Sequence, residues 1–194
     1  MPEVISNDFP RGPQGWCSYD YHASIVSGHT NVFILATHSP DGGPDGSGCV
    51  WTDHTRWSAD TPEQPLSILP LLFYRSWVDA DPIDLRGAEM SVSLRGDGMR
   101  LDGARCTFWV HAQGSRWHLT GQPVDIGIDS WASSSVRLKQ NPDQWHNSWS
   151  MDPQAPAPLE RVLAECVSYG FAFTGFSSEV SGRLSMARFH IDAV

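Results

Sequence analysis

The sequence contains almost no lysine and no long hydrophobic run. Lys139 is the single lysine among 13 basic residues, and the formal net charge is -9. Because nucleic-acid-binding surfaces need clustered positive charge, we expect no nucleic-acid partner. No segment reaches the roughly 18 apolar residues that a membrane-spanning helix requires, so we expect no membrane span. The overall charge also disfavours a strongly anionic ligand, unless local arginines attract one.

A secretory signal is missing from this sequence, because residues 1–8 have no basic start followed by an apolar stretch. We therefore expect a cytoplasmic protein by default, and an extracellular one if a signal has been removed. The cysteines are widely spaced and form neither a CxxC pair nor a zinc pattern. Cys106 and Cys166 lie in apolar runs, which is typical of small buried side chains. The complete set is Cys17, Cys49, Cys106 and Cys166.

Motifs for cofactors and nucleophilic catalysis are also missing. There is no phosphate-binding glycine loop, no HExxH zinc motif and no GxSxG serine elbow. Residues 41–46 carry aspartates but miss the EF-hand pattern, and a turn explains their Asp and Gly content better. A structural calcium ion held near the chain ends by Asp192 or Asp20 is conceivable in a sandwich, but no motif supports it. We therefore expect no cofactor and no metal site.

Glycine and proline are abundant, with 17 and 14 residues, and they separate many short strand candidates. These candidates are residues 16–22, 31–38, 49–53, 71–78, 89–95, 105–113, 116–120, 135–139, 170–176 and 183–191. Only residues 159–168 have the apolar spacing of a helix. This pattern predicts an all-β chain: an antiparallel two-sheet sandwich of jelly-roll type with one short helix near the C-terminus. We expect a single domain over residues 1–194, with residues 1–15 forming an irregular N-terminal arm.

Three local features refine this prediction. Residues 31–38 are apolar on both faces, which indicates a central strand. Pro70 cannot donate a ladder hydrogen bond, so the strand near 71–78 should begin after it or lie at a sheet edge. The alternation breaks at residues 186–188, which indicates a β-bulge.

The strand 105–113 is the most informative segment for function. Alternation puts Cys106 and Phe108 on a core face and puts Trp109 and His111 on the other. A two-residue turn, Gly114-Ser115, joins this strand to 116–120, so Arg116 and His118 should lie beside Trp109 and His111. An aromatic plate among hydrogen-bonding groups suits a sugar, whose ring has apolar faces and polar edges. The alternative is a solvated outer face that binds nothing.

Other segments repeat this combination of aromatic and polar side chains. In residues 71–78, Arg75 and Trp77 are two positions apart and share one face of the predicted strand. Residues 51–60 form a stretch rich in Trp and Asp that leads into a loop. We expect Arg75 and Trp77 to belong to the binding face. A loop at the rim of that face should contribute Trp51, Asp53, Arg56 and Trp57. Two placements fit residues 145–149, a covering of the sheet edge or the lining of a groove.

Two further interpretations remain open. An acid–base enzyme on the same scaffold would use His111 or His118 with Asp53, because a carboxylate can tune a histidine near neutral pH. An assembly domain would instead bury the exposed tryptophans against another protein. The sequence does not decide the oligomeric state.

Four segments of the C-terminal half resemble a known family. Residues 83–92, Trp131 ahead of residues 136–138, residues 169–176 and residues 182–191 are similar to strands of galactose-binding-like β-sandwich modules. This group includes many carbohydrate-binding modules. The resemblance implies a jelly-roll sandwich and a glycan or small polar ligand, but it carries over no catalytic or calcium-binding residue. Residues 1–80 match no family that we recognise. The function predicted is therefore carbohydrate binding.

Overall fold

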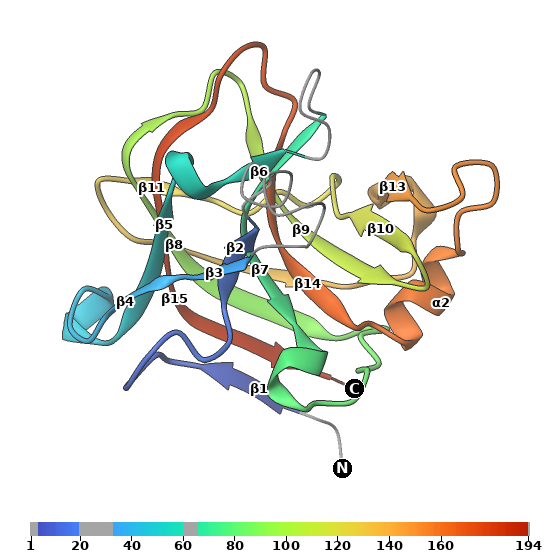
Figure 1. Ribbon diagram of the computed structural model, residues 1–194, viewed down its shortest axis with the longest axis horizontal. Coiled ribbons are helices and arrows are strands. Elements are labelled where there is room, and N and C mark those ends of the chain that lie inside the picture. The colour runs from blue at the N-terminus through green and yellow to red at the C-terminus, as the bar shows by residue number, and fades with distance from the viewer. Residues whose placement is uncertain (1–3, 20–32, 60–65, 194) are drawn as a thin grey trace.

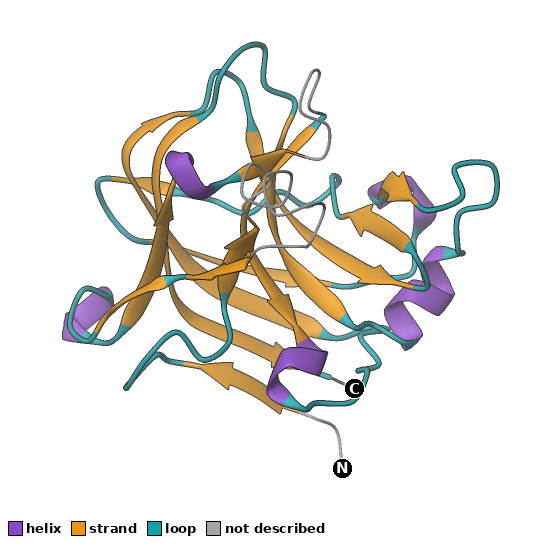
Figure 2. Cartoon of the chain, viewed as in Figure 1, coloured by secondary structure: helices purple, strands orange, loops and turns teal. Residues whose placement is uncertain are grey.

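The computed structural model describes residues 4–19, 33–59 and 66–193, which form two β-sheets packed face to face (Figures 1 and 2). Sheet A has the strand order β11-β8-β15-β5-β4, with β1 beside β15 and β12 beside β8. Its strands are β1 (Val4–Asn7), β4 (Thr37–Ser39), β5 (Cys49–Asp53), β8 (Glu89–Arg100), β11 (Gly127–Ile128), β12 (Ala132–Arg137) and β15 (Ser181–Asp192). All of its pairings are antiparallel except that of β11 with β8.

Sheet B has the strand order β13-β10-β9-β14-β7-β2-β3, with β6 beside β7. Its strands are β2 (Cys17–Tyr19), β3 (Phe33–Leu35), β6 (Ser58–Ala59), β7 (Ser67–Tyr74), β9 (Arg105–Ala112), β10 (Ser115–His118), β13 (His146–Ser150) and β14 (Ser168–Thr174). The short helices are η1 (Pro44–Gly46), η2 (His54–Arg56), η3 (Arg75–Val78), η4 (Pro142–Gln144) and α2 (Leu159–Ala164). The predicted antiparallel sandwich with one short α-helix is confirmed. No helix in the described ranges is long and apolar enough to cross a membrane.

An aromatic cluster fills the space between the sheets. The Trp16 side chain is fully buried, and its ring centroid lies 4.8 Å from that of Phe189 on sheet A and 6.1 Å from that of Phe171 on sheet B. The indole nitrogen donates a hydrogen bond to Asn7 Oδ1 at 3.0 Å, so β1 is attached to the same cluster. Period-two alternation along both strands thus buries one face of each sheet. The four cysteines are buried and free.

Residues 33–38, the described part of the strand predicted over 31–38, do not form one central strand. Within the described residues, the backbone leaves sheet B after β3 and enters sheet A at β4, and these strands lie at the ends of their sheets. The break falls at Ala36, whose amide donates to the Trp16 carbonyl oxygen instead of joining a ladder. The apolar run on both faces therefore reflects a change of sheet rather than a doubly covered strand.

Pro70 lies inside β7, which is paired on both sides, so the prediction that it starts or borders a strand is wrong. The pairing of β7 with β14 shifts register between Phe171 and Phe173, and this irregularity falls opposite Pro70. A bulge removes the need for the missing amide donor. The Pro70 carbonyl oxygen accepts hydrogen bonds from the hydroxyls of Ser18 and Thr52.

The bounds of other strands, helices and turns differ from the predicted ones by a few residues. Residues 4–7 form β1 rather than an irregular arm, and the helix expected over 159–168 ends at Ala164. Ala112 pairs with Ser115, so the hairpin turn is Gln113-Gly114 rather than Gly114-Ser115. Both turn residues have positive φ, as a twist-matched two-residue hairpin requires. The bulge predicted at residues 186–188 is confirmed by the register shift between β15 and β8 there.

Replacing Trp16 should show how much the cluster contributes to stability. We expect Trp16→Ala to lower the free energy of unfolding by about 3–5 kcal/mol, because it leaves a large cavity and strands a hydrogen-bond acceptor on Asn7. The matched control is Trp149→Ala, since Trp149 is 41% exposed and should cost much less. Urea denaturation of both variants measures the difference, and equal losses would contradict this account of the core.

Candidate functional site

Four of the predicted binding residues share the outer face of sheet B. On β9, Phe108 points into the core, so Trp109 and His111 point outward. The β9–β10 register sets His111 opposite Arg116 and Trp109 opposite His118. The hairpin therefore brings these four side chains together as the sequence predicted.

The register extends this group into two rows that cross five strands of sheet B, from β7 through β14, β9 and β10 to β13. We call the first row, which consists of Tyr74, Ser168, His111, Arg116 and Trp149, the His111 row. The second, the Trp109 row, consists of Leu72, Gly170, Trp109, His118 and His146. With strands about 4.8 Å apart, each row is about 19 Å long.

Trp109 is not the exposed plate that the sequence indicated. Its side chain is 2% exposed, and its indole nitrogen donates a hydrogen bond to the Phe171 carbonyl oxygen at 3.0 Å. The Arg116 guanidinium carbon lies 5.8 Å from the centre of the indole ring. Trp109 is thus the floor of this face, and it packs in a small cluster with Leu72 and Ala172.

The exposed aromatic side chains lie at the two ends of the His111 row. At one end Trp149 is 41% exposed, and its ring centroid is 6.0 Å from that of His111. At the other end Trp77 on η3 is 46% exposed, and its ring centroid lies 4.1 Å from Phe33 and 4.5 Å from Tyr74.

Trp149 and Tyr74 were not among the predicted site residues. The alternation along residues 145–149 was the sequence feature that could have identified Trp149. The sequence allowed two placements of this segment, over the sheet edge or in the lining of a groove. The segment forms β13 at one end of sheet B, which fits the sheet-edge placement, and the lining of a groove stays a prediction. Trp145 is buried and donates from its indole nitrogen to the Lys139 carbonyl oxygen, whereas Trp149 lies on the outer face.

Burial makes the two row histidines weak bases. Desolvation, followed by the nearby charge of Arg116, lowers the pKa of His111 from 6.5 to about 4. Desolvation is also the main cause that lowers the pKa of His118, with smaller effects from Arg116 and His146. Both imidazoles are therefore neutral at pH 7, and each offers one hydrogen-bond donor and one acceptor.

Several polar atoms on this face are buried without a hydrogen-bond partner in the described part of the chain. They are His111 Nδ1, both ring nitrogens of His118 and Ser168 Oγ. Buried polar atoms are paired in the great majority of cases, and leaving one unpaired costs roughly 1–3 kcal/mol. This concentration in adjacent rows gives the face unused hydrogen-bonding capacity.

Three predicted site residues serve the fold instead. Arg75 is buried on η3 and donates a hydrogen bond from Nε to the Asp81 carbonyl oxygen. Trp57 packs against the core and donates from its indole nitrogen to Thr52 Oγ1 at 3.0 Å. Arg56 donates to Thr37 Oγ1 at 3.1 Å. These side chains are therefore removed from the predicted binding face.

Trp51 and Asp53 lie on the outer face of sheet A, so they do not form a rim of the Trp109 face. Between them, Thr52 points inward, and its hydroxyl donates to the Pro70 carbonyl oxygen of sheet B. Since neighbouring residues of a strand face opposite ways, Trp51 and Asp53 face outward. Packed sheets are about 10 Å apart, and Asp53 points away from sheet B. The proposed acid–base pair of Asp53 with His111 or His118 is therefore wrong.

No group of three or more metal-ligating side chains occurs among residues 4–19, 33–59 and 66–193. In the segment 41–46, Asp45 forms an ion pair with Arg188 at 2.7 Å, consistent with a turn. Asp20, one of the two residues considered for calcium, lies outside the described residues. The expectation that no cofactor or metal is needed stays a prediction.

Comparison with known proteins finds no matching family model and no significantly similar curated protein. Solved structures do match. The family 11 carbohydrate-binding module from Clostridium thermocellum, in complex with a β-1,3-1,4-mixed-linked tetrasaccharide, has 10% identity and a TM-score of 0.51 over 98% of this chain and 96% of that chain. The CBM22-1 xylan-binding domain from Paenibacillus barcinonensis has 11% identity and a TM-score of 0.51 over 100% and 96%.

The chain has the β-sandwich fold of carbohydrate-binding modules. A third match, the CBM22-1 and GH10 modules of Clostridium thermocellum xylanase 10B, has 12% identity and a TM-score of 0.52, and covers 100% of this chain but only 28% of that one. The resemblance noted in the sequence is thus confirmed at the level of the fold. The narrower likeness to galactose-binding-like domains stays a prediction.

The lowered histidine pKa values predict a pH-dependent stability. The unfolded chain binds protons at these histidines near pH 6.5, whereas folded His111 does so near pH 4. The unfolded state therefore binds more protons in this window, and the free energy of unfolding should fall as the pH falls from 6.5 to about 4.

Urea denaturation at about pH 7 and about pH 4.5 measures this dependence. The double variant His111→Gln/His118→Gln should show a flatter dependence than the parent chain. An identical slope in the parent and the variant would contradict the assignment.

Proposed function

We propose that this protein is a glycan-binding module that binds its ligand along the outer face of sheet B. The observation that carries the proposal is the His111 row, where unpaired buried polar atoms lie between exposed aromatic rings. Hydroxyl groups both donate and accept hydrogen bonds, so they suit the partly exposed, neutral imidazole of His111. Aromatic rings at the ends of the row suit the apolar faces of sugar rings.

The length and direction of the row favour a chain of sugars over a single one. A row about 19 Å long that crosses five strands can contact several linked pyranose rings lying across the sheet. Trp149 and Trp77 would stack on sugars at the two ends, and the partly exposed side chains of Arg116 and His111 would bind hydroxyls in between. His118 and Trp109 would support this surface from the second row.

The comparisons support the same proposal. The similar family 11 module was solved with a bound tetrasaccharide, and the similar CBM22-1 domain is described as xylan-binding. Sequence identities of 10% and 11% do not transfer a ligand, so the identity of the sugar has to be measured.

A glycan array of neutral oligosaccharides, followed by calorimetry on the best ligand, tests the proposal. We expect Trp149→Ala to weaken binding by up to about tenfold, because stacking on one exposed ring contributes about 0.5–1.5 kcal/mol. The matched control is Trp51→Ala, which removes a partly buried tryptophan from the opposite sheet and should leave this binding unchanged. Wells with calcium and wells with EDTA should give the same result.

Trp109→Ala is a poor probe, since it removes a buried side chain and should destabilise the fold. Arg116→Gln is the better second variant, because it keeps most of the side chain's length. The proposal is wrong if neither Trp149→Ala nor Arg116→Gln weakens binding, or if Trp51→Ala weakens it equally.

A further inference from the structure

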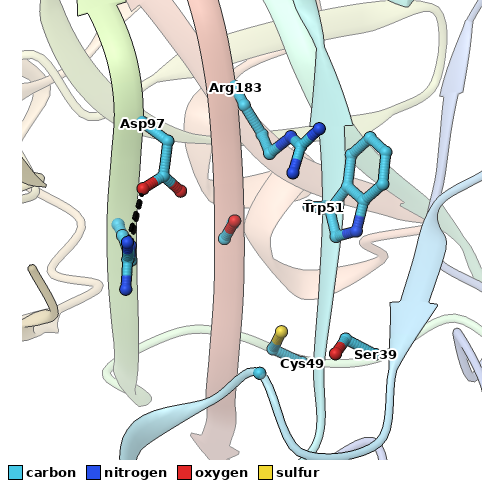
Figure 3. A pocket seen from close by; sticks show the side chains of 8 residues that line it. Ser39, Cys49, Trp51, Asp97 and Arg183 are labelled. Atoms are coloured by element: carbon cyan, nitrogen blue, oxygen red, sulfur yellow. Dashed lines mark hydrogen bonds and ion pairs between the residues drawn. The ribbon is translucent and has the colours of Figure 1, made fainter. Parts of the chain in front are cut away.

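The outer face of sheet A contains a polar hollow that the proposed glycan surface does not use. Its volume is about 160 Å³. The lining residues come from β4, β5, β8 and β15 and the loop after β4 (Figure 3). They are Ser39, Gly42, Cys49, Trp51, Arg95, Asp97, Arg183 and Ser185.

Arg183 is held over this hollow by an aromatic ring instead of a carboxylate. Its guanidinium carbon lies 3.7 Å from the centre of the Trp51 ring, and Figure 3 shows the two groups side by side. Strand register places Arg183 opposite both Asp53 and Asp97. Within the described part of the chain, however, Arg183 has no ion pair and no hydrogen bond from its side chain.

The neighbouring carboxylates are occupied by other partners. Asp97 forms an ion pair with Arg95 at 2.7 Å. Asp53 accepts hydrogen bonds from the hydroxyl and the backbone nitrogen of Thr55, and these bonds lower its pKa although partial burial opposes them. The planar donors of Arg183 therefore remain available to a ligand.

The geometry of the Arg183 guanidinium selects the ligand class. The charged lining residues are Arg95, Arg183 and Asp97, and the carboxylates of Asp53 and Asp41 lie beside the hollow, so among the described residues Arg183 is a single unpaired cation with acidic neighbours. A guanidinium donates two parallel hydrogen bonds to a carboxylate, and stacking on Trp51 keeps its edge oriented. Asp53 lies opposite Arg183 on the neighbouring strand β5. Its negative charge disfavours a ligand with more than one negative charge, so a single carboxylate fits best.

Polar groups around Arg183 suit a sugar that carries this carboxylate. The hydroxyls of Ser39 and Ser185 line the same hollow and can bond neighbouring hydroxyls of a ligand. We propose that this hollow is a second binding site, for the carboxylate of a sugar acid such as a uronic acid. It lies on the opposite sheet from the His111 row and does not depend on the glycan binding proposed there.

NMR titration of the full chain with glucuronate tests this site, with the Trp51 indole resonance, assigned by Trp51→Phe, as the reporter. We expect a dissociation constant in the millimolar range, typical of a small ligand with few contacts. Arg183→Gln should weaken binding by at least about tenfold, because it removes a charge-assisted hydrogen-bond pair. Arg183→Lys keeps the charge but loses the planar fork, so it should give an intermediate loss.

The matched control is Arg188→Gln on the same strand, since Arg188 is engaged by Asp45 and should not affect glucuronate binding. Glucose should fail to shift the Trp51 resonance, and acetate should bind more weakly than glucuronate. If acetate binds as tightly as glucuronate, the assignment of a sugar acid is wrong. If inorganic phosphate binds more tightly than glucuronate, the assignment of a carboxylate ligand is wrong. Unchanged glucuronate binding in Arg183→Gln would overturn the site itself.

Trp149→Ala separates this test from that of the proposed function. It should leave glucuronate binding unchanged while it weakens binding of the neutral glycan. Loss of glucuronate binding in Trp149→Ala would place the carboxylate on sheet B and overturn the proposal.

Discussion

Aromatic packing between the two sheets determines where every outer-facing side chain lies. Phe171 on β14 and Phe189 on β15 both contact Trp16, and this contact sets which parity of each strand faces inward. Once those residues are inside, Gly170 and the other residues of opposite parity must face outward. Both candidate binding surfaces are consequences of this core.

The outer face of sheet B depends on small residues as much as on polar ones. A Cβ at Gly170 would lie 2.3 Å from the Leu71 carbonyl oxygen and 3.0 Å from Trp109. The absence of that atom leaves room for the Trp109 ring next to β14, where its indole nitrogen donates to the Phe171 carbonyl oxygen. The buried Trp109 ring then supports the neighbouring His111 row from below. The exposed rings of Trp149 and Trp77 lie at the two ends of that row.

The two outer faces treat arginine in different ways. On sheet B, Arg116 lies near Trp109 and donates from Nε to Ser148 Oγ at 3.2 Å, so neutral donors and acceptors dominate the row. On sheet A, Arg183 lies on Trp51 with its donors free of protein partners in the described ranges. The core keeps these faces on opposite sides, so the two candidate surfaces are separate.

The sequence by itself determined the fold class, the apolar side of β9 and its pairing with β10, because alternation and short turns act between near neighbours in the chain. It also located the bulge near residue 187. It did not show that β5 belongs to the other sheet, that Trp109 is covered, or that residues 33–38 change sheets. Those features depend on contacts between residues far apart in the chain, such as Thr52 with Pro70. Only the tertiary structure could decide which tryptophans remain exposed, because exposure depends on what packs above a side chain.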